Sequence, residues 1–189
     1  MREYFKNNLP RLSLILIAIF FIFNILTLIF QKLGNILFLY PSNLHEPWNW
    51  YRFVTYPLYA GGLIKWFLSS LSFLFLGYLI EHRIKKSDLI GLIIISSVIG
   101  GLVFTIINQN DSYNIPIASP TMISWGYWAA GMVIGIKFLK ELSTIEKTIL
   151  ILYALSIFSI EAQDKGFLVG QIIVIITIAI LSFIKVKKK

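Results

Sequence analysis

Six apolar runs, each close to the length needed to cross a lipid bilayer, constrain this chain more than any other feature. They cover residues 12–30, 63–80, 89–107, 118–139, 148–160 and 166–184. A helix needs roughly 20 apolar residues to span a hydrocarbon core of ~30 Å, where every backbone polar group must be satisfied internally. Hydrophobic residues make up 57% of the 189 positions and charged residues 14%, a balance too apolar for a soluble domain. The chain is therefore predicted to be an all-α polytopic membrane protein.

The first and fifth runs need separate arguments. Residues 12–30 follow three basic residues, as the core of a signal peptide does, but the run is longer than such a core and no cleavage site follows it. We therefore expect it to be a retained span. Residues 148–160 give roughly 20 Å of helix at 1.5 Å per residue, so this span depends on flanking residues or on local thinning of the bilayer.

The basic residues between the runs predict the orientation. With the N-terminus inside, the inner segments hold most of the 17 lysines and arginines, whereas the outer segments hold only Lys32, Arg52, Lys65 and Lys165. The positive-inside rule then predicts six transmembrane helices with both termini in the cytoplasm. Removing the fifth span would break this alternation. We expect residues 1–189 to form a single membrane domain.

Charge and residue usage exclude several functions. The net charge of +8 lies in short clusters between apolar runs, which argues against nucleic acid as a partner. The chain has no cysteine, and its only histidines are His45 and His82, so we expect neither a metal site nor a cofactor. Membrane lipid is the expected partner. The first outer segment, residues 31–62, is rich in tryptophan and tyrosine, which favour the headgroup region.

A more specific pattern lies between residues 50 and 83. It reads Trp50-Tyr51-Arg52-x-x-Thr55-Tyr56, then an apolar run, then Gly77-x-x-x-Glu81-x-Arg83. This order and spacing resemble the rhomboids, the intramembrane serine proteases. The resemblance implies a six-helix rhomboid-like bundle in which Trp50, Arg52, Gly77, Glu81 and Arg83 have structural roles. It also implies a polar network at the inner end of the second span, although a solvated charged cluster would explain Glu81 and Arg83 as well.

The side chains that carry catalysis in rhomboids are missing from the matching positions of this chain. Catalytic rhomboids carry a histidine and an asparagine, one helical turn apart, that stabilise the oxyanion. Aligned without a gap, these positions fall on Lys65 and Ser69, and an upstream family histidine falls on Ala60. In the sixth span the family pattern is His-x-x-Gly-x-x-x-Gly, and this chain places Gln163 before Gly166 and Gly170. An amide cannot act as a general base, so the resemblance implies that the base is lost.

The nucleophilic serine of the family corresponds best to Ser119. It stands in Ile117-Ala118-Ser119-Pro120, without the two flanking glycines of the family, and proline removes one backbone N–H. A serine followed by proline is also explained as a helix N-cap followed by the first helical residue. Ser124 is a competing register that would lie deeper in the helix.

Lys65 has two interpretations. A lysine that is withdrawn from water can activate a serine, which would make Ser119 and Lys65 a dyad. Alternatively, Lys65 extends from the outer end of its helix to the interface. For packing, Gly131-x-x-x-Gly135 and Gly166-x-x-x-Gly170 predict close contact between the fourth and sixth helices.

Together these observations predict a rhomboid-like pseudoprotease without peptidase activity. By fold-level analogy with inactive rhomboids, it would bind transmembrane segments of client proteins. The alternative is an active intramembrane serine protease that uses Ser119 with Lys65. A transporter or channel is disfavoured, because no charge lies in the middle of a span. Residue usage rich in isoleucine, lysine and asparagine suggests a bacterial inner membrane.

Overall fold

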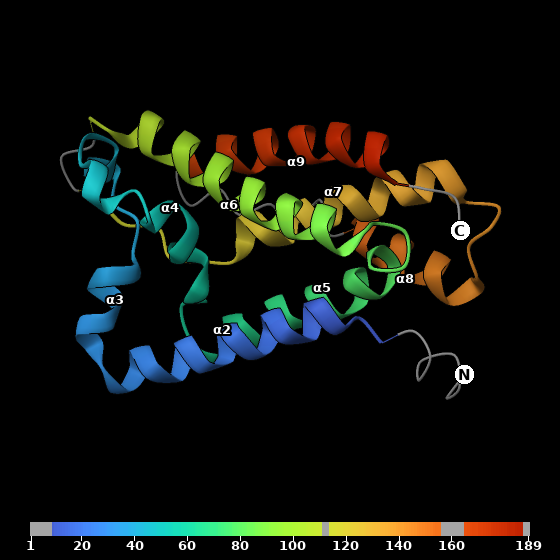
Figure 1. Ribbon diagram of the computed structural model, residues 1–189, viewed down its shortest axis with the longest axis horizontal. Helices are drawn as coiled ribbons and strands as arrows, with labels where there is room; N and C mark the ends of the chain where they lie inside the picture. The colour runs from blue at the N-terminus through green and yellow to red at the C-terminus, as the bar shows by residue number, and fades with distance from the viewer. Residues whose placement is uncertain (1–8, 111–113, 156–164, 187–189) are drawn as a thin grey trace.

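The computed structural model describes residues 9–110, 114–155 and 165–186, whose helices form an elongated bundle (Figure 1). Apart from an isolated bridge between Leu39 and Ile117, regular structure in this part of the chain is helical. The long helices are α2 (Arg11–Ile29), α5 (Leu63–Ile80), α6 (Lys86–Asn108), α7 (Thr121–Phe138), α8 (Thr144–Leu155) and α9 (Lys165–Lys185). Between α2 and α5 lie α3 (Gln31–Leu37), η1 (Pro41–His45), η2 (Pro47–Asn49), α4 (Arg52–Thr55) and η3 (Tyr56–Leu58).

Helices coincide with the predicted apolar runs, with some shifts at their ends. The run 63–80 is α5 itself, and the runs 12–30, 89–107 and 166–184 correspond to α2, α6 and α9. Within the described ranges, these four helices are long and apolar enough to cross a membrane. The run 118–139 becomes helical only at Thr121. The helix that corresponds to the run 148–160, α8, begins earlier than expected, at Thr144. Residues 156–160 of that run lie outside the described residues.

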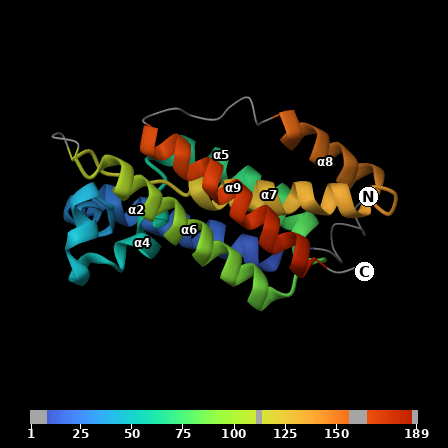
Figure 2. The ribbon, with the colours of Figure 1, turned by 90° about the horizontal axis from the view of Figure 1, so that it is seen from above.

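Helix α7 lies at the centre of the bundle and packs against α5, α6, α8 and α9 (Figure 2). Its inward positions are rich in small and aromatic residues, among them Gly126, Ala129, Ala130 and Gly131. A helix enclosed by other helices does not need an apolar surface toward lipid, and small residues allow its neighbours to approach. This position explains why α7 is less hydrophobic than the four lipid-exposed candidates.

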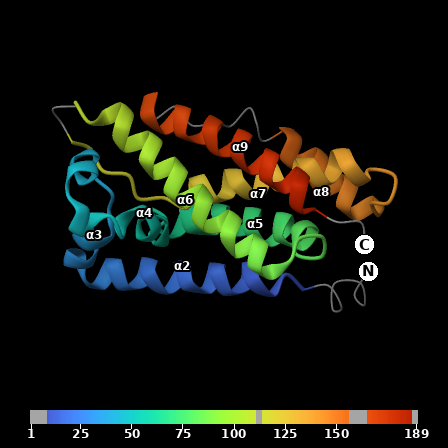
Figure 3. The same cartoon turned by 45° about the horizontal axis from the view of Figure 1, so that its top comes forward.

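Helices α6 and α9 run side by side over most of their length (Figure 3). A Cβ on Gly170 would lie 3.2 Å from the carbonyl oxygen of Gly100 and 2.9 Å from Cε of Met122. Gly170 and Gly100 therefore form a close contact in which the backbones of α9 and α6 approach, and Met122 of α7 fills the remaining space.

The predicted contact between the fourth and sixth helices is confirmed, although their two Gly-x-x-x-Gly motifs do not face each other. Helices α7 and α9 do pack together, but the nearest side chains to Gly131 are Leu76 and Leu79 of α5, and the nearest to Gly135 is Leu150 of α8. The motif of α7 therefore serves two other helices. The cause is geometric: the central helix is surrounded on all sides, so its small residues face several neighbours.

The segment between α2 and α5 is anchored on α6. The hydroxyl of Tyr56, which is fully buried, donates to the carbonyl of Ser97 at 3.1 Å, and the Ser97 hydroxyl donates to the carbonyl of Phe53 at 2.7 Å. Burial raises the pKa of Tyr56 far above its usual range, so its hydroxyl remains a neutral donor. A Cβ on Gly101 would lie 2.8 Å from a methyl group of Leu39, which shows how closely this segment covers α6.

Candidate functional site

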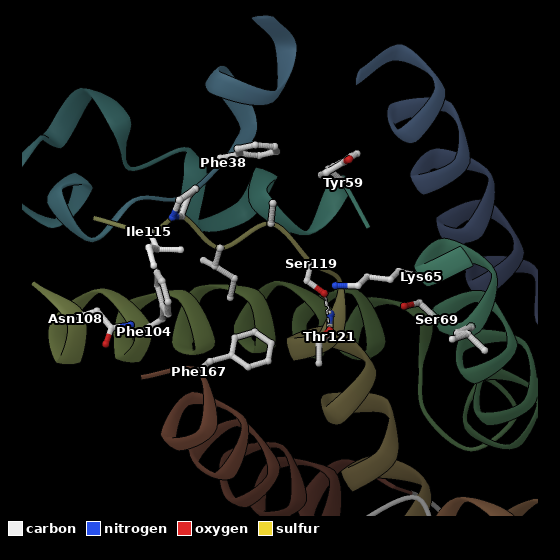
Figure 4. A pocket seen from close by; sticks show the side chains of 14 residues that line it. Phe38, Tyr59, Lys65, Ser69, Phe104, Asn108, Ile115, Ser119, Thr121 and Phe167 are labelled. Carbon is white, nitrogen blue, oxygen red and sulfur yellow. Dashed lines mark hydrogen bonds between the residues drawn. The ribbon is translucent and has the colours of Figure 1, made fainter. Parts of the chain in front are cut away.

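A cavity of about 430 Å³ lies where α5, α6, α7 and α9 meet the segment that precedes α7 (Figure 4). Its lining combines aromatic and aliphatic side chains with a few polar groups. The lining residues are Phe38, Tyr59, Lys65, Leu68, Ser69, Phe104, Asn108, Ile115, Pro116, Ile117, Ala118, Ser119, Thr121 and Phe167. An apolar cavity with a few convergent polar groups is the usual form of a binding or active site.

Ser119 is held by an extended segment that pairs with the loop after α3. The backbone N–H of Ile117 donates to the carbonyl of Leu39 at 2.9 Å, and the N–H of Leu39 donates to the carbonyl of Ile117 at 3.1 Å. This pairing fixes the chain just before Ser119 and turns the hydroxyl toward the cavity. The extended backbone also delays the start of α7.

Ser119 has the hydrogen bond expected of a cap, although regular α7 begins one residue later than predicted. Helix α7 begins at Thr121 with Pro120 at the cap position, where its ψ of 4° differs from that of a regular helix. The Ser119 hydroxyl oxygen instead accepts the backbone N–H of Thr121 at 3.3 Å and lies 2.5 Å from the Thr121 hydroxyl oxygen. Ser119 is therefore a turn residue that already has a hydroxyl partner.

Lys65 and Ser69 reach the same cavity from the first turns of α5. Figure 4 shows the Lys65 side chain extending toward Ser119, with Ser69 on the same side of the helix. A Cβ on Gly61 would lie 3.3 Å from Cδ of Lys65, so the lysine stem passes over this glycine. The structure thus brings Lys65 and Ser69 close to Ser119, which lies about 50 positions later in the sequence.

Neither histidine of the chain lines this cavity. His45 is exposed in η1, and His82 follows the far end of α5, where its Nδ1 lies 3.1 Å from the carbonyl oxygen of Tyr78. At 1.5 Å per residue, α5 separates Lys65 from His82 by roughly 25 Å. Among the described residues, the groups near Ser119 that carry chemistry are hydroxyls, an amide and one ammonium.

Two other residues that the sequence pointed to, Ser124 and Ala60, do not line the cavity. Ser124 lies within α7 and does not line the cavity, and its buried hydroxyl has no hydrogen-bond partner among the residues that the structure describes. Gln163 lies outside the described residues. Ala60 is buried, and its N–H donates to Oδ1 of Asn24 at 3.3 Å.

Glu81 and Arg83, at the inner end of α5, have two separate partners. The Glu81 carboxylate accepts the backbone N–H groups of Leu12 at 3.0 Å and Ser13 at 2.7 Å, in the first turn of α2. It therefore caps that helix from a distance and complements its dipole. The Arg83 guanidinium pairs with Glu146 of α8 at 3.1 Å, and both side chains are almost fully buried.

The remaining motif residues make structural contacts. Arg52 donates to the carbonyl of Phe38 at 3.1 Å and to Oδ1 of Asn43 at 3.4 Å, which holds the loop segment together. The Trp50 side chain is 55% exposed, and its indole N–H donates to the carbonyl of Leu44 at 3.4 Å. A Cβ on Gly77 would overlap Oγ of Ser13, so α2 and α5 touch there.

Gly166 begins α9 next to the cavity. A Cβ at this glycine would lie 2.6 Å from the side-chain nitrogen of Asn108, which lines the cavity together with Phe167. The Asn108 side chain at the end of α6 therefore packs directly against Gly166 at the start of α9.

Several of these residues were not predicted from the sequence. Asn108, Thr121 and Phe167 carry no distinctive pattern, because their place on the cavity depends on how α6, α7 and α9 meet. Glu146 could have been found: Ser143-x-x-Glu146 is a capping-box pattern, and the Ser143 N–H donates to the Glu146 carboxylate at 2.8 Å.

Comparison with known proteins adds one finding. A family model described as the rhomboid domain matches residues 47–185, which is well over half of the chain. The matched range includes α5 to α9, every residue of the cavity lining except Phe38, and the motif residues Arg52, Gly77, Glu81 and Arg83. The search of curated proteins found no match.

Proposed function

The chain belongs to the rhomboid family, and from this premise we propose that it is a membrane-embedded pseudoprotease that binds transmembrane segments of client proteins. The observation that carries the proposal is the cavity at Ser119, whose described lining contains no histidine. A serine hydroxyl is a weak nucleophile unless a base or a lowered pKa activates it. Pro120 also supplies no backbone N–H beside Ser119 for an oxyanion.

The client role follows from the fold by analogy. The described helices present apolar side chains outward, such as Phe67 of α5, 55% exposed, and Leu152 of α8, 62% exposed. In lipid, such faces can pack against another transmembrane helix. Photo-crosslinking residues at these two positions should capture segments of other membrane proteins in cells. Adducts with lipid alone at both positions would contradict client binding.

The topology that we propose has six transmembrane helices with both termini in the cytoplasm of a bacterial inner membrane. The distribution of basic residues supports this orientation, because Lys85, Lys86 and Lys140 lie in segments on the same side as the termini. In this arrangement α7 and α8 also cross the membrane, enclosed or flanked by the four more apolar helices.

One observation favours a second candidate function, serine proteolysis with Lys65 as the base. Lys65 extends toward Ser119 across the cavity (Figure 4). A lysine can take the proton of a serine hydroxyl, so this pair has the elements of a dyad. The Ser119 hydroxyl is already paired with Thr121, which makes it a less available nucleophile.

Activity-based labelling distinguishes the two candidates. Purified protein is treated with a fluorophosphonate and with an isocoumarin, next to a proteolytic rhomboid as a positive control. We expect no labelling that depends on Ser119, because the base and the oxyanion donors are lacking. Labelling that is lost in both Ser119→Ala and Lys65→Met would overturn the pseudoprotease proposal in favour of the dyad.

A further inference from the structure

The cavity at Ser119 carries a positive charge without a negative one. Among the described residues that line it, Lys65 is the one charged side chain, and none is aspartate or glutamate. The Lys65 side chain is exposed, and its stem passes over Gly61 in the direction of Ser119. A lysine so placed attracts an anion from outside the protein.

Two helices add to this charge by beginning at the cavity. Lys65 belongs to the first turn of α5 and Thr121 is the first residue of α7. Neither helix has an acidic residue in its first turn, and the Ser119 hydroxyl that accepts the Thr121 N–H is neutral, so no negative charge offsets the positive end of either helix dipole. These dipoles and the Lys65 ammonium both favour an anionic ligand.

The rest of the lining is suited to an apolar chain. Phe104, Ile115 and Phe167 lie at the end of the cavity away from Lys65, and Asn108 is next to them (Figure 4). The hydroxyls of Ser69 and Ser119 lie near the ammonium, where they can donate to an anionic oxygen. A cavity of about 430 Å³ is within the usual size of small-molecule sites, roughly 300–1,000 Å³.

We propose that this cavity is a binding site for an anionic amphiphile, with a phosphate or carboxylate head beside Lys65 and an acyl chain against Phe104 and Phe167. The surrounding bilayer supplies such molecules, because the family and the apolar helices place the chain in a membrane. Two sources share this chemistry: the headgroup of an acidic phospholipid and a free fatty acid. Binding does not require the chain to be proteolytic or inactive, so the inference goes beyond the proposed function.

Native mass spectrometry of the full-length protein in detergent tests the site. The protein is titrated separately with phosphatidylglycerol, with phosphatidylcholine of the same acyl chains, and with oleate. We expect one phosphatidylglycerol to be retained in preference to phosphatidylcholine. Competition by oleate would identify a free fatty acid as a second source, and absence of competition would assign the site to phospholipid. Equal retention of the two phospholipids by the unmodified protein would overturn the proposal.

Substitutions of lysine locate the site. Lys65→Met should reduce phosphatidylglycerol retention roughly fivefold, because one lysine near a membrane surface contributes about that much to anion binding. Lys65→Arg keeps the charge and should retain the lipid, which separates loss of charge from misfolding. Lys32→Met, which removes an exposed lysine of α3 outside the cavity lining, should have no effect. Equal retention by Lys65→Met and Lys32→Met would also overturn the proposal.

A second variant tests the site independently by filling the end of the cavity that holds the anionic head. Ser69→Phe places a ring in the cavity and leaves Lys65 unchanged, so it should displace phosphatidylglycerol. Retention of the lipid by Ser69→Phe at the level of the unmodified protein would show that the lipid binds elsewhere. The two proposals fail in different experiments. Failure of the lipid-site proposal appears as unchanged lipid retention, whereas failure of the pseudoprotease proposal appears as labelling of Ser119.

Discussion

Arg83 and Glu146 form an ion pair that water hardly reaches. Their side chains are 6% and 9% exposed, and the nitrogen–oxygen distance is 3.1 Å. The second carboxylate oxygen of Glu146 accepts from the N–H and the hydroxyl of Ser143, so each buried oxygen has a partner. Such a pair joins the end of α5 to the start of α8 and cannot lose one member without leaving a buried charge.

We therefore expect Arg83→Met to reduce the free energy of unfolding by about 3–5 kcal/mol, as for other buried pairs that lose one partner. The double variant Arg83→Met/Glu146→Gln should be more stable than this single variant, because the glutamine removes the charge and can still cap α8. Unfolding in detergent measures both.

The exposed pair of Lys185 and Asp88, also at 3.1 Å, provides a matched control. Lys185→Met should cost less than about 1 kcal/mol, since the lysine side chain is 49% exposed and water screens the pair. Equal losses from Arg83→Met and Lys185→Met would contradict a stabilising role that depends on burial.

At the scale of the helices, α2 depends on α5 at two points. Glu81 caps the start of α2, and Gly77, one turn earlier, allows the buried Ser13 to fit against α5. The Ser13 hydroxyl in turn donates to the hydroxyl of Tyr127 at 3.3 Å, so α2, α5 and α7 meet here. A single small residue thus sets the distance between two long helices.

Gly77→Ala should accordingly destabilise the protein by about 1–3 kcal/mol, because the new methyl group would overlap Ser13. Gly91→Ala in α6 is the matched control. A Cβ there meets nothing within 4 Å, so this change should be neutral or stabilise the helix by about 0.5–1 kcal/mol. Thermal unfolding in detergent compares the two variants. Adding Ser13→Gly to Gly77→Ala should restore stability, and no restoration would place the strain elsewhere.

At the scale of the whole molecule, hydropathy and position in the bundle must be considered together. Helix α7 is enclosed by its neighbours and contains glycine, alanine and aromatic residues, whereas α2 and α9 expose isoleucine, leucine and phenylalanine. The central helix α7 is therefore less apolar than the four candidate spans α2, α5, α6 and α9. For this reason a count of apolar helices underestimates the proposed number of spans.

The proposed orientation is testable by labelling, because the chain has no cysteine of its own. A cysteine at the exposed Asn110 should react in intact cells with a reagent that cannot cross the membrane. Cysteines at Lys85 and Glu141 should react only after the membrane is permeabilised. The orientation would be overturned if all three cysteines reacted in intact cells, or if the cysteine at position 110 reacted only after permeabilisation.

The sequence by itself determined the class of fold and most helix positions. Apolar runs are a local property, and in a bilayer an apolar run of this length has few alternatives to a helix. The motif from Trp50 to Arg83 pointed to the rhomboid family, which the family model then showed. The resemblance to that family, through alignment without a gap, then pointed to Ser119, Lys65 and Ser69.

Only the tertiary structure decided which residues share a surface. It placed Ser119, Lys65 and Ser69 on one cavity with Phe104 and Phe167, showed that the glycines of α7 face α5 and α8, and paired Arg83 with Glu146. These contacts join residues far apart in the chain, and they depend on the rotation and crossing of whole helices. A sequence pattern records which side of a helix is small or polar, but the neighbour that meets that side is determined by the packing of the complete bundle.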